Sequence, residues 1–284
     1  MRGAATPPMP FTGGERPQLQ TEERMPQHLR IANARFERRE LGDWAETETA
    51  RDITRSLEMV HDASRTAMTM IAGAPGIGKS MAVQRFCDRL GHDAIYMQAA
   101  RGEGTAWNVA HALANLWGSA RPAFNCHSEA RDILAEYIGA GRVLIVDEAQ
   151  YLHQRNRRTG QVGEAYEWLR AGAEAGGFKL VFCGDMTLVP AIATMPQLQS
   201  RMMRPVVIER ASREDVAALV EGTAFHTAKA IDALHAVARL HGGLRNVENV
   251  ARIAQLFAGS EPPGPEHLRA AIHDMKLTPK GGRK

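Results

Sequence analysis

A short segment of the chain reads Gly73-Ala-Pro-Gly-Ile-Gly78-Lys79-Ser80 and matches the spacing G-x-x-x-x-G-K-[ST] at every position. Such a loop can wrap a phosphate with its backbone N–H groups, because glycines adopt the required conformations and a following helix adds the positive end of its dipole. We expect the Lys79 amine to reach the β- and γ-phosphates of a nucleotide and the Ser80 hydroxyl to bind Mg²⁺. The predicted nucleotide-binding residues are Gly73, Ala74, Pro75, Gly76, Ile77, Gly78, Lys79, Ser80 and Met81.

A second motif, Val143-Leu-Ile-Val-Asp147-Glu148, is an apolar run that ends in two acids. We expect Asp147 to hold the Mg²⁺ ion with its water shell, and Glu148 to polarise the attacking water as a general base. Acids are common at strand ends, so this motif is weak alone and gains its meaning from the phosphate loop. Together the two motifs favour nucleotide hydrolysis over nucleotide binding alone.

The chemistry requires strands and helices that bring these motifs together. Short apolar runs predict five strands, and the segments between them have helical spacing. Strands that alternate with helices indicate an α/β fold with a parallel sheet covered on both faces. The predicted strands are 67–72, 94–98, 143–146, 180–183 and 206–208, and the predicted helices among them are 45–64, 80–90, 105–116, 130–140 and 163–175.

The two ends of the chain differ from this pattern. Residues 1 to about 30 are rich in proline, glycine and threonine and poor in aliphatic residues, which predicts a loose arm. From 214 to 257 the pattern is wholly helical, and prolines end it. A last helix is expected at 266–275, followed by a basic tail that includes Lys280, Arg283 and Lys284.

The composition is that of an ordinary globular chain. Its 284 residues include 35 Lys and Arg against 32 Asp and Glu, which gives a net charge of +3 and does not by itself indicate nucleic-acid binding. No apolar run is long enough to span a membrane, and the first residues lack the apolar core of a secretory signal. Cys87, Cys126 and Cys183 are too widely spaced for a disulfide framework or a zinc site. We therefore expect a cytoplasmic protein.

With both motifs in place, the sequence resembles the AAA+ ATPases over about residues 45–260. The resemblance implies a P-loop core with a five-stranded parallel sheet between helices, followed by a small all-helical lid, with ATP and Mg²⁺ as the bound groups. It predicts a largely disordered arm at 1–44, the ATPase core at 45–210, the lid at 211–260, and a short C-terminal helix with a basic tail at 261–284.

Further residues acquire roles only from this resemblance. Leu180-Val-Phe-Cys-Gly-Asp185 lies where the family has its sensor 1 strand, so Asp185 takes the place of the usual Asn, Ser or Thr. In Gln197-Leu-Gln-Ser-Arg201-Met-Met-Arg204-Pro205, Arg201 is the first choice and Arg204 the second for an arginine finger that reaches a neighbouring subunit. Gly242-Gly-Leu-Arg245 matches the sensor 2 pattern, which places Arg245 on the γ-phosphate.

Within the AAA+ ATPases the sequence is most similar to the transposition helpers, the group of phage Mu transposition protein B and the TniB and TnsC ATPases. The wording Val-Asp-Glu-Ala-Gln-Tyr-Leu at 146–152 is typical of that group, as is Cys-Gly-Asp followed by a short helix and Leu-x-Ser-Arg-x-x-Arg-Pro. The resemblance implies a protein of a bacterial or phage-infected cell that self-associates into a ring or helical filament on duplex DNA. It further implies target DNA selection, stimulation of a transposase, and disassembly driven by ATP hydrolysis.

Two basic loops are candidates for contact with DNA. One is the turn 100–105, where Arg101 supplies a charge beside the N-terminus of the next helix. The other is 153–158, where Arg155, Arg157 and Arg158 occupy three of four positions. Either loop could instead be an ordinary solvated surface. In the functional interpretation each subunit offers few charges, and self-association multiplies them.

The tryptophans bear on the mode of DNA binding. Trp107, Trp117 and Trp168 have the spacing of buried helix residues, so we expect them in the core rather than on a base-stacking surface. This favours contacts to the duplex backbone with little sequence preference.

Two other functions remain open at this stage. The Asp-Glu-Ala-Gln wording also occurs in secretion-linked ExeA-type ATPases, although these usually have a membrane or peptidoglycan-binding part. A replication helicase loader would share the fold. Both alternatives keep the ATP site and differ in the partner.

Overall fold

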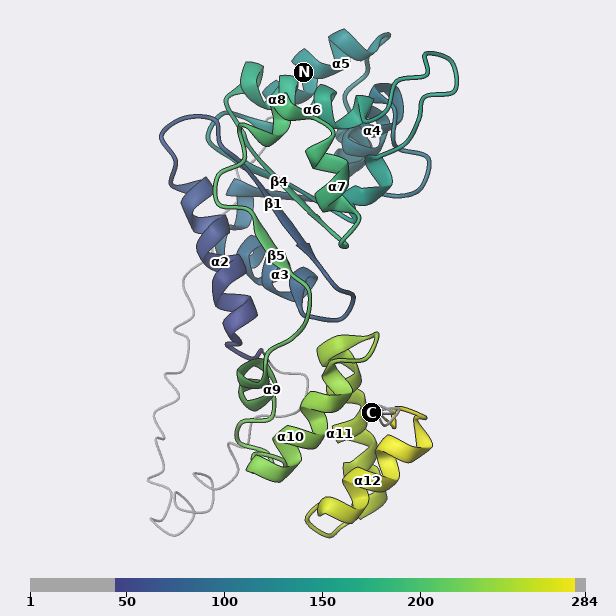
Figure 1. The fold of residues 1–284 in the computed structure, drawn as a ribbon. Helices are drawn as coiled ribbons and strands as arrows, with labels where there is room; N and C mark the ends of the chain where they lie inside the picture. The colour runs from purple at the N-terminus through teal and green to yellow at the C-terminus, as the bar shows by residue number, and fades with distance from the viewer. Residues whose placement is uncertain (1–43, 279–284) are drawn as a thin grey trace, which may run out of the picture. The chain divides into compact units, whose positions relative to one another are not determined.

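The computed structural model describes residues 44–278, so the predicted N-terminal arm up to residue 43 and the last residues of the predicted basic tail lie outside it. Five parallel strands form one sheet in the order β2-β3-β4-β1-β5 (Figure 1). This confirms the predicted α/β fold with a five-stranded parallel sheet. The strands are β1 (Met68–Gly73), β2 (Ala94–Gln98), β3 (Val143–Asp147), β4 (Lys179–Gly184) and β5 (Val206–Ile208).

The sheet register brings the motifs to one edge. In β1, β3 and β4 every residue is buried, as expected for central parallel strands that read as apolar runs. β4 lies between β1 and β3, and Ala72 pairs with Gly184 while Val146 pairs with Phe182. Because parallel strands end at the same edge, the phosphate loop after β1 and the acids after β3 flank the end of β4.

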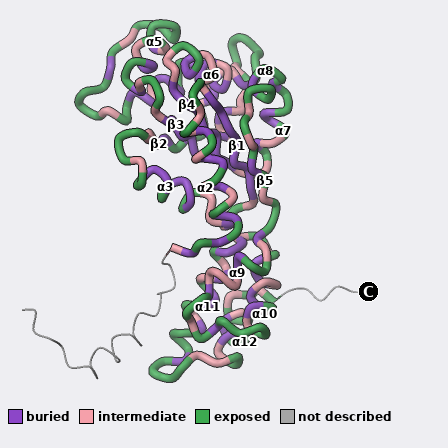
Figure 2. Tube along the Cα trace, turned by 90° about the vertical axis from the view of Figure 1, so that its left-hand side faces the viewer, coloured by how far each residue is buried: buried purple, intermediate pink, exposed green. Residues whose placement is uncertain are grey.

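Helices cover both faces of the sheet. On one face, α2 (Glu48–His61) and α3 (Lys79–Leu90) pack through Ile53, Leu57 and Phe86 onto Ile145 and Val181. The other face is covered by α4 (Ala106–Ala114), α5 (His127–Ile138), α6 (Glu164–Gly176), α7 (Leu188–Ala193) and α8 (Pro196–Gln199). Buried residues accordingly follow the strands and the inner sides of these helices (Figure 2). Short 3-10 turns are η1 (Gly91–Asp93), η2 (Asn115–Ala120) and η3 (Ala149–Leu152).

The remaining helices form a third apolar cluster, separate from those on the two faces of the sheet. They are α9 (Arg213–Leu219), α10 (Ala228–Ala238), α11 (Gly243–Ala258) and α12 (Pro265–Asp274). Val216, Leu234, Val247 and Leu268, one from each helix, are all buried in it. The continuous helical pattern predicted for 214–257 is therefore three helices, separated by turns around 220–227 and 239–242. The limits of the predicted lid stay predictions, and α12 shares the apolar cluster of the helices before it.

The prediction that all three tryptophans are buried is wrong for Trp107. Trp168 is buried and Trp117 partly so, whereas Trp107 is 40% exposed. It is the second residue of α4, whose buried face consists of other positions. Its ring stands edge-on against the rings of His111 and Phe124, at centroid distances of 4.3 and 5.6 Å, so it packs on the surface of the helix.

Asp215 joins the start of α9 to α2. This buried carboxylate accepts hydrogen bonds from the Thr49 backbone N–H at 2.9 Å and the Thr49 hydroxyl at 2.8 Å. It also accepts one from the Ser212 N–H at 3.0 Å, as the return half of the capping box of α9. A single side chain thus satisfies donors from both helices. Among residues 44–278, no helix combines the length and apolar character needed to cross a bilayer.

We predict that Asp215→Ala lowers the free energy of unfolding by about 2–4 kcal/mol, because it leaves buried donors of Thr49 and Ser212 without an acceptor. The matched control is Asp232→Ala, which removes an exposed carboxylate that pairs with Arg213 and is expected to cost less than about 1 kcal/mol. Urea unfolding followed by circular dichroism measures both. Equal losses in the two variants would contradict the structural role of Asp215.

Candidate nucleotide-binding site

The phosphate loop connects the last residue of β1, Gly73, to the first residue of α3, Lys79. Gly76 and Gly78 have φ of +79° and +93°, which lie in the left-handed region that favours glycine. Ile77 is buried and anchors the middle of the loop. Gly78 is the N-cap of α3, and no side-chain cap accepts the N–H groups of the first helical turn. These N–H groups are therefore available to bind an anion such as a phosphate.

Lys79 is folded back onto the loop. Its amine donates hydrogen bonds to the carbonyl oxygens of Gly73 at 2.7 Å and Ala74 at 3.0 Å. Burial lowers the pKa of Lys79, and Cys183 and nearby carboxylates, Asp147 first among them, partly oppose this shift. A phosphate in the loop would offer this partly desolvated amine a stronger partner than two neutral carbonyls.

Ser80 and Asp147, the two predicted Mg²⁺ ligands, are in direct contact. The Ser80 hydroxyl donates to Asp147 Oδ2 at 2.8 Å, and the Tyr96 hydroxyl donates to the same oxygen at 2.9 Å. Asp147 Oδ1 accepts the backbone N–H of Glu148 at 2.9 Å. A hydroxyl and a carboxylate are the hard oxygen donors that Mg²⁺ prefers.

The protein supplies few ligands beyond this pair. Within residues 44–278, no group of three His, Cys, Asp or Glu side chains could hold a metal ion. A Mg²⁺ ion at Ser80 and Asp147 would therefore complete its shell with phosphate oxygens and water, as is usual for this ion. Tyr96 was not predicted as a site residue, since nothing in its own segment marks it. Burial and the adjacent Asp147 raise its pKa, so it stays a hydrogen-bond donor.

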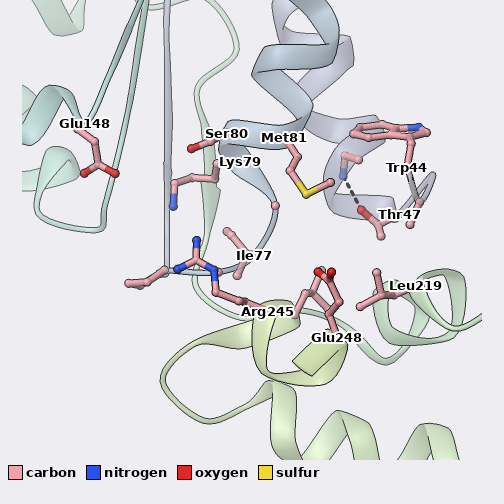
Figure 3. Close-up of a pocket in the computed structure, with 16 residues that line it drawn as sticks. Trp44, Thr47, Ile77, Lys79, Ser80, Met81, Glu148, Leu219, Arg245 and Glu248 are labelled. Carbon is pink, nitrogen blue, oxygen red and sulfur yellow. Dashed lines mark hydrogen bonds between the residues drawn. The ribbon is translucent and has the colours of Figure 1, made fainter. Parts of the chain in front are cut away.

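Glu148 lies beside the loop with an unusual backbone. Its φ of +53° is in the left-handed region, and it begins the turn η3. Its carboxylate accepts a hydrogen bond from the side-chain amide of Gln150. In Figure 3 the carboxylate lies on the same side of the pocket as the Lys79 amine. Gln150 had no predicted role of its own, and its contact with Glu148 was not predicted from the sequence.

The Asp185 carboxylate is turned to its own chain. It accepts hydrogen bonds from the backbone N–H of Thr187 at 2.8 Å and from the Thr187 hydroxyl. These contacts form the turn that leads into α7. The backbone N–H of Asp185 donates to Gln150 Oε1 at 3.1 Å. The sensor role of the Asp185 side chain stays a prediction. The backbone N–H of Asp185 is linked to Glu148 through Gln150.

Arg245 enters the pocket from the third residue of α11. Its backbone N–H donates to the Gly76 carbonyl at 3.1 Å, and its side chain extends into the pocket beneath Lys79 in the view of Figure 3. The two backbones are so close that a Cβ on Gly76 would lie 1.9 Å from the Gly242 carbonyl oxygen. A Cβ on Gly243 would in turn lie 3.1 Å from the carbonyl oxygens of Pro75 and Gly76, so Gly76 and Gly243 together allow α11 to approach the phosphate loop.

Other pocket residues were missed by sequence reasoning. They are Trp44, Ala45, Thr47, Ala50, Leu219, Leu244 and Glu248, and they line the pocket together with Met81 and Glu148 (Figure 3). Trp44 was assigned to the loose arm. Four of them lie at 44–50, before and at the start of α2, Leu219 ends α9, and Leu244 and Glu248 flank Arg245 in α11. None of these segments has a spacing that marks it as part of a nucleotide site. They add apolar surface next to the phosphate loop, which suits a nucleotide base.

Arg201 and Arg204 do not line the pocket, and both have partners in their own chain. Arg201 is half-exposed, pairs with Glu174 and donates to the Gln197 carbonyl at 2.7 Å. Arg204 pairs with Asp52 and also donates to its carbonyl at 3.0 Å. A role across a subunit interface stays a prediction for either residue. The double attachment of Arg204 to α2 makes Arg201 the freer of the two.

The two basic loops lie against each other. Gly104 fits against Gln154, because a Cβ on this glycine would lie 2.5 Å from the Gln154 Cβ. Glu164 accepts the backbone N–H of Ala106 at 3.2 Å and also the Asn156 side-chain amide, so it ties one loop to the other. The Arg101 guanidinium lies over the Tyr151 ring, 5.6 Å from its centroid.

The arginines of the second loop project from an ordered turn. Arg155 forms an antiparallel bridge with Val162, and the Asn156 side chain accepts the backbone N–H groups of Arg158 and Thr159. Arg155, Arg157 and Arg158 are exposed, as is Arg101 in the first loop. We call Arg101, Arg155, Arg157 and Arg158 the basic double loop.

Comparison with known proteins agrees with this geometry. Residues 61–191 match the family described as AAA domain, and residues 200–275 match the family described as Mu B transposition protein, C terminal. Among curated proteins, no sequence matches this chain significantly.

Structures that share the fold include proteins named ORC and Cdc6p. The ORC1 protein of Aeropyrum pernix in complex with DNA is 19% identical with a TM-score of 0.56, and the match covers 80% of this chain and 64% of that one. Drosophila ORC bound to DNA is 17% identical with a TM-score of 0.57, over 95% and 71% of the two chains. Cdc6p from Pyrobaculum aerophilum is 14% identical with a TM-score of 0.57, over 85% and 70%. The chain thus spans about two thirds of these relatives, and identities this low show the fold alone.

We predict that Gly76→Ala weakens ATP binding at least about tenfold, because the new Cβ collides with the Gly242 carbonyl and alanine resists a φ of +79°. Gly177→Ala is a matched control. Gly177 also has a positive φ, but its Cβ would have ordinary contacts and it lies at the end of α6, away from the pocket. Titration with a fluorescent ATP analogue measures the affinity. Unchanged affinity in Gly76→Ala would refute the requirement for close approach.

Proposed function

Because the chain belongs to the AAA+ ATPases of the Mu B type, we propose that it binds and hydrolyses ATP with Mg²⁺ and uses the nucleotide to assemble on duplex DNA. In this role it selects target DNA, delivers it to a transposase and stimulates that enzyme. ATP hydrolysis then drives disassembly. The observation that carries the proposal is the meeting of Lys79, Ser80, Asp147 and Glu148 at one edge of the sheet.

Each of these groups has a definite part in hydrolysis. The loop N–H groups and Lys79 bind the β- and γ-phosphates, and Mg²⁺, when bound at Ser80 and Asp147, neutralises charge that develops on the phosphate oxygens. Glu148 accepts a hydrogen bond from the attacking water and orients it toward the γ-phosphate. Arg245 contributes positive charge from α11.

Nucleotide binding can also control assembly. Arg245 and the Gly242–Gly243 pair belong to α11, whereas Gly76 belongs to the phosphate loop, so a bound triphosphate contacts both segments. Arg201, which is exposed, is our candidate for the group that contacts the nucleotide of a neighbouring subunit. A triphosphate would then hold subunits together, and its hydrolysis would release them.

The basic double loop is our candidate for the DNA contact. Its four arginines are exposed on loops that Glu164 joins, and the Glu164 carboxylate is occupied by two hydrogen bonds within the chain. Arginines on ordered loops suit the phosphates of a duplex, where they position the protein without reading bases. Because the net charge is only +3, strong binding requires many subunits side by side.

A role as a secretion regulator or as a helicase loader keeps the ATPase and changes the partner. Sedimentation with ATP, in the presence and absence of duplex DNA, separates these roles from the proposed one. ATP-dependent co-sedimentation with duplex DNA supports the proposal. Its absence, together with ATP-dependent binding of a hexameric helicase, would favour a loader.

We predict opposite effects for two variants in such sedimentation. Lys79→Ala prevents ATP-dependent assembly, because the β- and γ-phosphates lose their charged partner. Glu148→Gln retains assembly on DNA and lowers hydrolysis at least about a hundredfold, so the protein stays in the DNA-bound form. Loss of DNA binding in Glu148→Gln, with ATP still bound, would contradict the mechanism.

We predict that DNA affinity falls steeply between low and moderate salt, because binding rests on phosphate contacts. Replacing Arg157 and Arg158 by alanine should lower the slope of log affinity against log salt by up to about 2 per subunit. The matched control replaces Arg65 and Arg269 by alanine. Both are exposed and lie outside the basic double loop, so the two double variants have the same net charge. Fluorescence anisotropy with labelled duplex measures the slopes. Equal slopes in both double variants would show that another surface binds DNA.

A further inference from the structure

Gln150 connects the end of β3 to the end of β4 through the two atoms of its side-chain amide. Its Nε2 donates to Glu148 Oε2, and its Oε1 accepts the backbone N–H of Asp185 at 3.1 Å. We infer that Gln150 is the positioning residue that orients the Glu148 carboxylate for hydrolysis and ties it to the end of β4. The inference rests on the proposed ATPase function and adds a residue to it.

The backbone of Gln150 is firmly held. It lies in η3, between the buried residues Ala149 and Leu152. The buried Tyr166 hydroxyl donates to the Ala149 carbonyl at 2.6 Å, and the Tyr151 N–H donates to the Glu148 carbonyl at 3.0 Å. With the turn anchored on both sides, the amide of Gln150 has a defined position from which to hold its two partners.

Gly184 provides the space that this amide needs. A Cβ on Gly184 would lie 2.4 Å from Gln150 Oε1 and 3.4 Å from its backbone nitrogen. The φ of Gly184 is not in the left-handed region, so conformational freedom does not explain the glycine here. The explanation is the contact with Gln150. Two segments that are distant in sequence, 147–150 and 183–185, therefore meet through one amide.

This contact has a chemical consequence for Glu148. A general base works only when an oxygen is held within hydrogen-bond reach of the water, and an error near 1 Å can cost about a hundredfold in rate. Gln150 holds Oε2 with a neutral donor, and Oε1 takes no hydrogen bond from the residues described. The carboxylate therefore keeps one oxygen for the water while its rotation is restricted.

The link also connects the base to the predicted sensor strand. The Asp185 carboxylate is committed to Thr187, but the Asp185 N–H reaches Gln150. Any shift at the end of β4 would displace the amide and hence Glu148. In this arrangement the end of β4 acts on the base through its backbone, with the Asp185 side chain shaping the turn.

A double-mutant cycle tests the inference. Steady-state MgATP hydrolysis in the presence of duplex DNA is measured for wild type, Gln150→Ala, Gly184→Ala and the double variant, together with the Kd of a fluorescent ATP analogue. We expect Gln150→Ala to lower kcat at least about tenfold, with KM and Kd within about threefold of wild type. Gly184→Ala should lower kcat in the wild-type background, because its Cβ displaces the Gln150 amide.

The double variant distinguishes positioning from general damage. Once Gln150 is alanine, the shortest contact of the added Cβ at position 184, 2.4 Å to Gln150 Oε1, is gone. The contacts that remain are 3.2 Å to the flexible Leu188 side chain and 3.4 Å to the backbone nitrogen of residue 150, so the double variant should be no slower than Gln150→Ala alone. Gln255→Ala, at an exposed position of α11, is the control for loss of an amide and should hydrolyse ATP at the wild-type rate.

The other outcomes are decisive as well. A kcat for Gln150→Ala within twofold of an active wild type would overturn this inference and leave the proposed function intact. Additive losses in the double variant, or a loss in Kd equal to the loss in kcat, would assign Gln150 a purely structural role and also overturn it. A wild type that hydrolyses no ATP with DNA present would overturn the proposed function, and this inference with it.

Discussion

The carboxylate of Asp147 is buried at the end of β3 and accepts hydrogen bonds from three segments of the chain. A buried charge is costly unless it is fully partnered, so these donors are required for the fold as well as for the site. Ser80 belongs to α3, Tyr96 to β2, and the third donor is the backbone of Glu148. One carboxylate thereby fixes the start of α3, the edge strand and the turn that contains the proposed base. Folding of the sheet and assembly of the site are the same process at this point.

The side chains around Glu148, at the ends of the parallel strands, include both neutral and charged groups. Burial lowers the pKa of Lys79, although Cys183 and nearby carboxylates partly oppose this shift, and burial raises the pKa of Cys183 well above its usual value. The glutamine at 150 contacts Glu148 with an amide, where a cation would neutralise the carboxylate and an acid would repel it. Arg245 of α11, which is exposed, adds a second positive charge beside the phosphate loop. In the proposed mechanism this arrangement leaves Glu148 able to act as a base, while the groups that contact the nucleotide neutralise the phosphate.

The parts of this arrangement differ in how well the sequence predicts them. Buried parallel strands are apolar runs, so all five were located, and the phosphate loop with the Asp147–Glu148 pair carries its meaning in local spacing. The helical pattern from 214 to 257 hid two turns, because the residues in them continue the apolar periodicity. Trp107 was placed in the core because its spacing fits a helix, but spacing does not say which face of α4 is buried. Trp44, Leu219 and Glu248 each come from a different part of the chain. Asp185, whose N–H donates to Gln150, lies 35 residues from it in the sequence. Contacts of this kind exist only after folding, and a single sequence has no local pattern that marks them.

The positions of the charged side chains say more about partners than the net charge of the chain does. A net charge of +3 says little about partners, because it sums groups that never act together. Several arginines are neutralised inside the chain: Arg170 pairs with Glu167 and Glu174, and Arg204 with Asp52. The basic double loop has no such acidic partner among the ion pairs of residues 44–278. Two carboxylates near it, Glu103 and Glu164, accept hydrogen bonds from the loops themselves, and Glu164 joins the two loops. A few arginines held on one ordered surface are too few for tight binding by a single subunit. In the proposed function, ATP would assemble many subunits along one duplex and so make these arginines sufficient. The affinity for DNA would then be set by the same nucleotide whose hydrolysis Glu148 would catalyse.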